Sequence, residues 1–218
     1  MHAKYKLLVF DWDGTLMDSH REIIQCFQSA AKDLNLESPP DEDIRNIIGI
    51  GMEEAICALF PAFSSPQLCA RFKERYRHYY FHAEKEQSQL YTGVYEMLLS
   101  LARHGYFLAV ATSKGRRGLN DVLARTELAK IFHTTRCIDE ALSKPNPQML
   151  LDILDILGIP ANEALMIGDT EYDLQMANNA NVDAIGVTCG AHSEDRLWKQ
   201  QPIACLTETK ALYAWLGN

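Results

Sequence analysis

Two aspartates separated by one residue follow the first apolar run of the chain. Asp11 and Asp13 lie in the segment DWDGTL (residues 11–16), directly after the run Lys6–Phe10. In extended backbone, residues two apart point to the same side, so these carboxylates repel each other and favour a bound cation or a shared proton. Magnesium prefers oxygen ligands, commonly one or two carboxylates together with water and substrate phosphate. The pair therefore indicates metal-assisted chemistry on a phosphorylated compound.

Further acids, hydroxyls and a lysine occur after other apolar runs or just before a helix. In an open parallel sheet, ligands bind at the carboxyl ends of the strands, so residues that follow different strands converge on one edge. An apolar core gains nothing from such a set, whereas a site for phosphate and magnesium uses each member. The residues are Thr112, Ser113, Lys144, Asp169 and Asp173.

Phosphoryl transfer mainly requires in-line positioning and neutralisation of the phosphate oxygens. Asp11 is the candidate nucleophile, because a metal can mask its repulsion from the phosphate. Asp13 would protonate the leaving alkoxide and then activate the water that hydrolyses the aspartyl phosphate. An unperturbed aspartate has a pKa of about 3.9, so this role requires an upward shift.

The remaining polar residues have supporting roles in this scheme. The carboxylates of Asp11 and Asp169, with the backbone carbonyl of Asp13, are the candidate ligands of Mg²⁺. Thr112 and Ser113 would donate hydrogen bonds to phosphate oxygens, and Lys144 would supply a fixed positive charge. Taken singly, the two hydroxyls would be a helix N-cap and the lysine a surface residue, so their assignment depends on the whole set.

The elements that must position these residues alternate along the chain. Short apolar runs read as buried strands, and amphipathic stretches between them read as helices. Such alternation predicts an α/β fold with a Rossmann-like, three-layer core whose sheet is mainly parallel. The expected strands are Lys6–Phe10, Phe107–Ala111, His133–Cys137, Ala164–Ile167 and Ala184–Val187, and the expected helices are Val94–His104, Arg116–Arg125, Pro147–Leu157 and Leu174–Ala180.

One stretch breaks the alternation. Between Ser19 and Leu90 no strand pattern is found, and the segment is predicted to be an inserted all-helical cap. We expect a core formed by residues 1–18 and 91–218, a cap formed by residues 19–90, and hinges near Asp18–His20 and Gln89–Gly93. The expected cap helices are Arg21–Leu34, Asp43–Ile48, Met52–Phe60 and Gln67–Glu86.

The composition limits the partners. The net charge of -8 and the isoelectric point of about 5.4 argue against nucleic acid or an anionic membrane. The six cysteines form no C-x-x-C pair, and no secretory signal or membrane-spanning run is apparent. We therefore expect a cytoplasmic protein with unpaired thiols, acting on a small molecule, either as a monomer or as a homodimer.

Four motifs in this order resemble those of the haloacid dehalogenase (HAD) superfamily. The resemblance extends from Leu7 to about Val187, which is most of the chain. A single D-x-D-G-T is moderately specific, whereas four ordered motifs at strand ends or helix starts are highly specific. The matching segments are DWDGT at residues 11–15, Thr112-Ser113, Lys144-Pro145, and Gly168-Asp169 together with Asp173.

The resemblance implies a Rossmann-like core with a helical cap inserted after the first motif, and it is strongest to the phosphoglycolate phosphatase-like branch. In that branch the cap closes over the substrate and contributes a recognition loop. Gly49, Ile50 and Gly51 stand where that loop is expected. Asp173 would correspond to the acid that orients a metal-bound water or Lys144.

Several functions share these residues. The leading interpretation is magnesium-dependent hydrolysis of a small phosphate monoester through an aspartyl phosphate, with phosphoglycolate as the first candidate and sugar phosphates or nucleoside monophosphates as others. A sugar phosphomutase would use the same catalytic residues. A phospho-accepting signalling domain also combines acids, a threonine and a lysine, but it has no helical insert after its first strand. A dehalogenase is disfavoured, because attack on carbon requires neither Asp13 nor magnesium.

Overall fold

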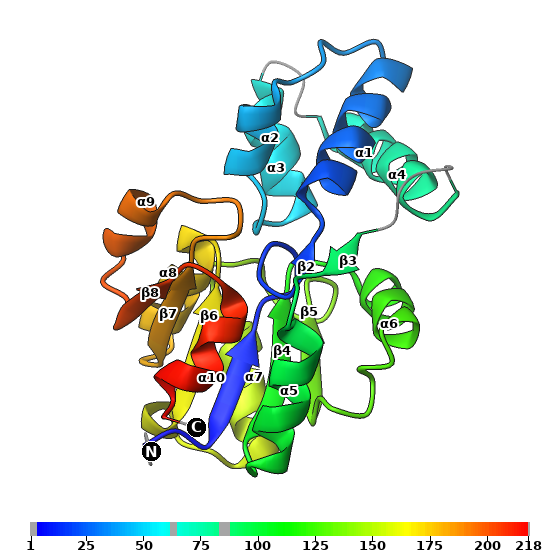
Figure 1. Ribbon diagram of the computed structural model, residues 1–218. Helices are drawn as coiled ribbons and strands as arrows, with labels where there is room; N and C mark the ends of the chain where they lie inside the picture. The colour runs from blue at the N-terminus through cyan, green and yellow to red at the C-terminus, as the bar shows by residue number, and fades with distance from the viewer. Residues whose placement is uncertain (1–3, 62–64, 83–87, 218) are drawn as a thin grey trace.

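A six-stranded parallel sheet lies at the centre of the larger part of the molecule (Figure 1). The computed structural model describes residues 4–61, 65–82 and 88–217. The strand order is β5-β4-β1-β6-β7-β8, so the chain leaves β1 at the middle and builds outward in both directions. The strands are β1 (Leu7–Phe10), β4 (Phe107–Thr112), β5 (Thr134–Cys137), β6 (Ala164–Gly168), β7 (Asp183–Val187) and β8 (Ala204–Leu206).

Both faces of this sheet are buried by helices. In β1, Leu8 and Phe10 belong to one hydrophobic cluster and Leu7 and Val9 to the other, as the two-residue period of a strand requires. Helices α5, α6 and α10 contribute to the first cluster, and α7 and α8 to the second. Burial on both sides explains why β1 reads as a continuous apolar run. The predicted three-layer α/β core is confirmed.

Six helices and two short 3-10 turns belong to the described part of this core. All five predicted strands are present, and so are the four predicted helices, Arg116–Arg125 with the predicted ends and the other three with one or both ends shifted. Strand β8 and helices α9 and α10 were not predicted, because each is only three to five residues long and carries little periodicity. The helices are α5 (Val94–Arg103), α6 (Arg116–Arg125), α7 (Gln148–Leu157), α8 (Glu171–Asn179), α9 (Glu194–Trp198) and α10 (Leu212–Trp215), with turns η2 (Ala161–Glu163) and η3 (Thr209–Ala211).

A bundle of four helices stands above the carboxyl ends of the strands (Figure 1). Its hydrophobic cluster is separate from the two that cover the sheet, and Phe72 lies at its centre, with ring centroids 5.5 Å from both Phe27 and Phe60. The predicted helix Gln67–Glu86 is present as far as His82, and its last four predicted residues, 83–86, lie outside the described part. The bundle helices are α1 (His20–Asp33), α2 (Asp41–Asn46), α3 (Met52–Leu59) and α4 (Pro66–His82).

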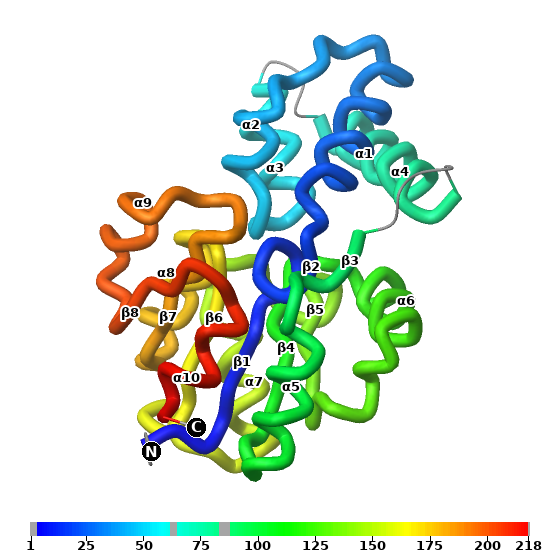
Figure 2. The backbone as a smooth tube through the Cα atoms, in the orientation of Figure 1, coloured from blue at the N-terminus to red at the C-terminus, as the bar shows by residue number. Residues whose placement is uncertain are grey.

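The chain passes between core and bundle through two adjacent short strands (Figure 2). Strand β2 (Met17–Asp18) pairs antiparallel with β3 (Gln89–Leu90), and the Tyr91 amide donates to the Leu16 carbonyl at 3.0 Å. The expectation of no strand between Ser19 and Leu90 is wrong at this point, because a two-residue strand leaves no periodic pattern. None of the described helices is both long enough and apolar enough to cross a membrane.

Candidate active site

Asp11 is held at the carboxyl end of β1. Its amide donates to the Ile167 carbonyl of β6 at 2.9 Å, and the residue is only 3% exposed. The chain then turns sharply, and Gly14 adopts a φ of +85°. A Cβ atom at Gly14 would lie 2.2 Å from Asp169 Oδ2, so a larger residue would displace that carboxylate. The turn after β1 therefore brings the first motif against the end of β6.

Asp169 follows β6 and is fully buried. The Thr15 hydroxyl donates to its Oδ1 at 2.8 Å, and the Ala191 amide donates to its Oδ2 at 2.8 Å. His20 Nε2 lies 3.8 Å from Oδ2, which is beyond hydrogen-bond distance but close enough for a favourable electrostatic interaction. Burial opposes ionisation, yet these neighbours together lower the pKa of Asp169. The carboxylate is thus held ionised in one orientation.

Lys144 links two acids of the site. Its side chain is fully buried, and its Nζ lies 2.6 Å from Asp11 Oδ1 and 2.6 Å from Asp173 Oδ1. Burial alone would lower the pKa of Lys144, but the two carboxylates raise it overall, so the ammonium is charged. Burial raises the pKa of Asp11 well above its usual value, against the opposing effect of Lys144. A cation beside Asp11 would lower that pKa and keep the nucleophile ionised.

Asp173 contacts two parts of the molecule, the start of α8 and the side chain of Lys144. It is the third residue of α8 and forms a capping box with Thr170, in which its Oδ2 accepts from the Thr170 amide at 3.1 Å and from the Thr170 hydroxyl at 2.7 Å. Its other oxygen accepts from Lys144. The capping box also explains why α8 begins at Glu171 rather than at the predicted Leu174: its polar first turn carries no apolar period. Asp173 therefore connects the start of α8 to Lys144.

The two predicted phosphate-binding hydroxyls lie at the end of β4, beside β1. Thr112 is buried, and its Oγ1 accepts from the Lys114 amide at 3.1 Å. Ser113 Oγ donates to the Gly49 carbonyl at 2.6 Å. The structure thus places both residues at the predicted edge, with Ser113 already in contact with the cap.

The predicted cap loop reaches the core. The Gly51 amide donates to Ser143 Oγ at 2.8 Å, next to Lys144. Gly49 has a φ of +102°, and a Cβ there would lie 2.8 Å from Thr170 Oγ1. Ile50, between them, packs against the hydrophobic cluster of the cap. The loop therefore covers the edge of the sheet where the motifs converge.

Asp13 lies beside the buried cluster and has a different partner. Lys114 Nζ is 2.9 Å from Asp13 Oδ2 and also donates to the Tyr80 hydroxyl of α4 at 3.1 Å. Burial alone would lower the pKa of Lys114, but Asp13 and Tyr80 raise it overall. Asp13 Oδ1 is buried and has no hydrogen-bond partner among the described residues.

The acidic cluster fits a divalent cation. Asp11, Asp169 and Asp173 each offer a carboxylate oxygen within 4.8 Å of the others, and all three are buried. The three carboxylates exceed the one ammonium of Lys144 by two negative charges. A buried excess of this kind costs several kcal/mol unless a counter-charge is present. An ion of charge +2 with oxygen preference, such as Mg²⁺, matches this donor set.

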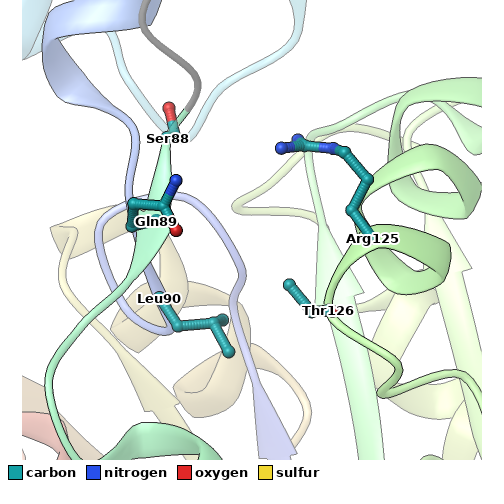
Figure 3. Close-up of a pocket in the computed structure, with 5 residues that line it drawn as sticks. All are labelled: Ser88, Gln89, Leu90, Arg125 and Thr126. Atoms are coloured by element: carbon teal, nitrogen blue, oxygen red, sulfur yellow. The ribbon is translucent and has the colours of Figure 1, made fainter.

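A cavity of about 490 Å³ lies at the hinge rather than over the carboxylates. Figure 3 shows Ser88, Gln89 and Leu90 on one side of it, facing Arg125 and Thr126 at the end of α6. None of the predicted site residues lines this cavity. The carboxylates are instead covered by the cap loop, which is hydrogen-bonded to the core at Ser143 and Ser113.

Four residues near the site were not assigned a role from the sequence. Thr15 lies within the first motif, and Lys114 follows the second, so each stands beside a residue that was singled out. His20 was included only in the expected hinge. Tyr80 carried no signal, because a tyrosine on an amphipathic helix reads as packing.

Comparison with known proteins agrees with this geometry. The family model described as haloacid dehalogenase-like hydrolase matches residues 8–187. The chain belongs to the haloacid dehalogenase-like hydrolases. It is a phosphatase of this family. It is 34% identical over 199 residues to "Probable phosphatase IndB" of Dickeya dadantii, covering 90% of this chain and 86% of that protein.

Two further relatives extend the comparison. The phosphoglycolate phosphatase of Vibrio cholerae is 29% identical over 204 residues and is covered over 90% of each chain. The structure "Crystal structure of Putative haloacid dehalogenase-like hydrolase from Bacteroides fragilis" superposes with a TM-score of 0.90 at 26% identity, covering 96% of this chain and 100% of that one. The match extends over the cap as well as the core.

Proposed function

We propose that this HAD phosphatase hydrolyses a small phosphate monoester, with Mg²⁺, through a phosphorylated Asp11. The observation that carries the proposal is the placement of Asp11. Its carboxylate is buried at the sheet edge, paired with Lys144 and grouped with two further acids. A structural role alone does not account for three buried carboxylates placed together when one ammonium pairs with only two of them.

Mg²⁺ would be held by the carboxylates of Asp11 and Asp169 and by the backbone carbonyl of Asp13, and it would supply charge neutralisation for the phosphate oxygens. Thr15 and the Ala191 amide fix both oxygens of Asp169 in position. Hydrogen bonds that orient a ligand in this way raise metal affinity.

The side chains then divide the reaction between them. An oxygen of Asp11 attacks phosphorus while Asp13 gives a proton to the leaving alkoxide. Lys144, Thr112 and Ser113 hold the phosphate oxygens. Asp13 next takes a proton from the water that attacks the aspartyl phosphate, which releases inorganic phosphate and restores Asp11.

The position of the cap is an argument for a small substrate. The loop Gly49–Gly51 is in hydrogen-bonding contact with the core at Ser113 and Ser143, and Asp11 is only 3% exposed with the cap in this position, which favours a small substrate over a macromolecule. Phosphoglycolate-like metabolites are the first class to test, since a relative of this chain is named a phosphoglycolate phosphatase. Ser113 must exchange its bond to Gly49 for one to phosphate when substrate binds.

The test is phosphate release from p-nitrophenyl phosphate and from a panel of small phosphorylated metabolites, with Mg²⁺ or with EDTA. Release that requires Mg²⁺ and disappears in Asp11→Asn supports the proposal, and the best panel member names the substrate class. Asp121→Asn is the matched control, because Asp121 is a half-exposed aspartate paired with Arg125 on α6. Full activity of Asp11→Asn would overturn the assignment of the nucleophile.

A further inference from the structure

One lysine outside the four motifs touches the proposed acid of the reaction. Lys114 follows Thr112 and Ser113 at the end of β4, and its side chain is only 7% exposed. Its Nζ lies 2.9 Å from Asp13 Oδ2. A surface ion pair would contribute little, but a buried charge-assisted bond of this length restricts the orientation of the carboxylate.

The same ammonium also touches the cap. Lys114 Nζ donates to the Tyr80 hydroxyl at 3.1 Å and lies 4.8 Å from the centroid of that ring. Tyr80 belongs to α4, whereas Lys114 and Asp13 belong to the core. A single Nζ atom therefore joins the cap to the proposed acid, and movement of α4 away from the core would break one of its two contacts.

The two oxygens of Asp13 are in different situations. Oδ2 accepts from Lys114, while Oδ1 is buried without a hydrogen-bond partner among the described residues. A buried oxygen without a partner is costly, and it is explained if the substrate supplies the missing partner. Oδ1 is thus the oxygen available to the leaving group.

We propose that Lys114 is a positioning residue for Asp13, that Tyr80 secures Lys114 only when the cap is closed, and that Oδ1 of Asp13 exchanges the proton. This inference rests on the proposed function. Cap closure then prepares the acid at the moment when the substrate is enclosed. With the cap open, Lys114 keeps its bond to Asp13 but lacks the Tyr80 contact that restricts its own side chain.

The proton balance is simple. In the first half-reaction, the proton on Oδ1 moves to the leaving oxygen as its bond to phosphorus breaks and the bond from Asp11 to phosphorus forms. In the second, Oδ1 takes a proton from the attacking water as the bond from Asp11 to phosphorus breaks. Lys114 keeps its own protons throughout, so it acts only through Asp13.

The test compares leaving groups, since an alkoxide requires a proton and nitrophenolate does not. The value of kcat/KM includes every step up to release of the alcohol, so it reports the proton transfer to the leaving oxygen. Tyr80→Phe removes one hydroxyl and keeps the ring. It should lower kcat/KM for an alkyl phosphate about tenfold, the effect of one hydrogen bond to a charged group, and lower it less than about twofold for p-nitrophenyl phosphate.

Tyr79→Phe is the matched control, because Tyr79 is the preceding residue on α4 and its hydroxyl interacts with Asp33 and Arg75 rather than with the core. Tyr79→Phe should leave kcat/KM unchanged for both substrates. Lys114→Met should show the same selectivity as Tyr80→Phe with a larger factor, on the order of a hundredfold for the alkyl phosphate. Equal losses on both substrates would overturn the positioning role, since they would indicate general damage to the site.

Two reference variants separate this inference from the proposed function. Asp11→Asn should abolish activity toward both substrates, and Asp13→Asn should affect the alkyl phosphate most. If these two behave as stated while Tyr80→Phe and Lys114→Met show no selectivity, only the role of Lys114 is wrong. If Asp11→Asn remains active, the proposed function itself fails.

Discussion

The edge of the sheet and the cap face the same site but are stabilised differently. At the edge, charged groups such as Asp11, Lys144 and Asp169 are buried and joined by short ionic or hydrogen bonds. The cap has its own hydrophobic cluster and contacts the core through a few hydrogen bonds at Asn46, Gly49, Gly51 and Tyr80, two of them at Asn46.

Because of this difference, the core can hold a fixed geometry while the cap moves. Charges inside the core cannot shift without a large electrostatic cost, so the buried charged groups keep their geometry. A cap attached by a few hydrogen bonds, each contributing about 1 kcal/mol, can open and close without disturbing them. Four variants or measurements test this contrast, beginning with the one that should act most strongly.

Replacement of Lys144 by Met should damage the core most. It leaves Asp11 and Asp173 buried without their shared cation, which should lower the free energy of unfolding by roughly 3–5 kcal/mol. Loss of its charge should reduce kcat about 10²- to 10³-fold in the protein that remains folded. Urea denaturation and phosphate release measure the two effects.

The control for Lys144→Met lies on the cap surface. Lys73 pairs with Glu53, whose side chain is 68% exposed, so Lys73→Met should change stability by less than about 1 kcal/mol. A similar loss in both variants would contradict the contrast between a buried ionic core and a solvated cap.

Phe72→Ala should affect the cap and spare the core. Phe72 is fully buried against Phe27 and Phe60, and its removal should cost the cap roughly 3–5 kcal/mol. All three tryptophans lie in the core, at positions 12, 198 and 215, so tryptophan fluorescence follows core unfolding alone. Hydrogen exchange of cap peptides should accelerate while the fluorescence midpoint in urea stays in place.

A large shift of that midpoint would show that cap and core unfold together. Leu101→Ala is the counterpart in the core, because Leu101 is fully buried in the cluster that covers one face of the sheet. It should move the fluorescence midpoint and leave the relative protection of the cap unchanged.

Gly49→Ala should act on cap closure with a smaller energy. The residue has a positive φ, and the added Cβ would meet Thr170 Oγ1 at 2.8 Å, so the loop must move by an amount that costs about 1–3 kcal/mol. We expect kcat/KM to fall about tenfold with little change in the melting temperature of the core. Gly105→Ala, at a φ of +85° with no atom within 4 Å, carries the backbone strain without the clash and should retain activity.

The reactivity of buried thiols should differ between cap and core by the smallest factor of the four tests. Burial raises the pKa of Cys69 in the cap, and it raises the pKa of Cys137 in β5 to about 12. At pH 8 both are therefore protonated and unreactive while folded, because only the thiolate reacts. In mild urea the cap should open first, so iodoacetamide should label Cys69 several-fold faster than Cys137.

Exposed Cys57 provides the reference rate for that labelling, which peptide mass spectrometry follows. If Cys137 reacted as fast as Cys69 under the same conditions, the cap would have no lower stability than the core.

The sequence predicted which polar residues gather at this edge of the sheet, because each of them follows a readable element. Asp11 and Asp169 stand directly after apolar strands, and Lys144 and Asp173 stand at motif positions near helix starts. The parallel sheet then brings them together without further information. Strand β8 and the pair of β2 with β3 could not be predicted, because segments of two or three residues have no period and form only when a neighbouring strand offers its backbone.

The charged residues and their contacts can be divided in the same way, into what the sequence predicted and what only the tertiary structure shows. The sequence by itself predicted the polar residues that gather at the sheet edge, their order along the chain and the helical insert, because these depend on residue type and local periodicity. Only the tertiary structure decided that Lys144 joins Asp11 to Asp173, that Lys114 touches Asp13, and that Tyr80 of the cap completes that contact. These contacts join residues far apart in sequence, and no local pattern encodes which side chains meet once two independently packed bodies close on each other.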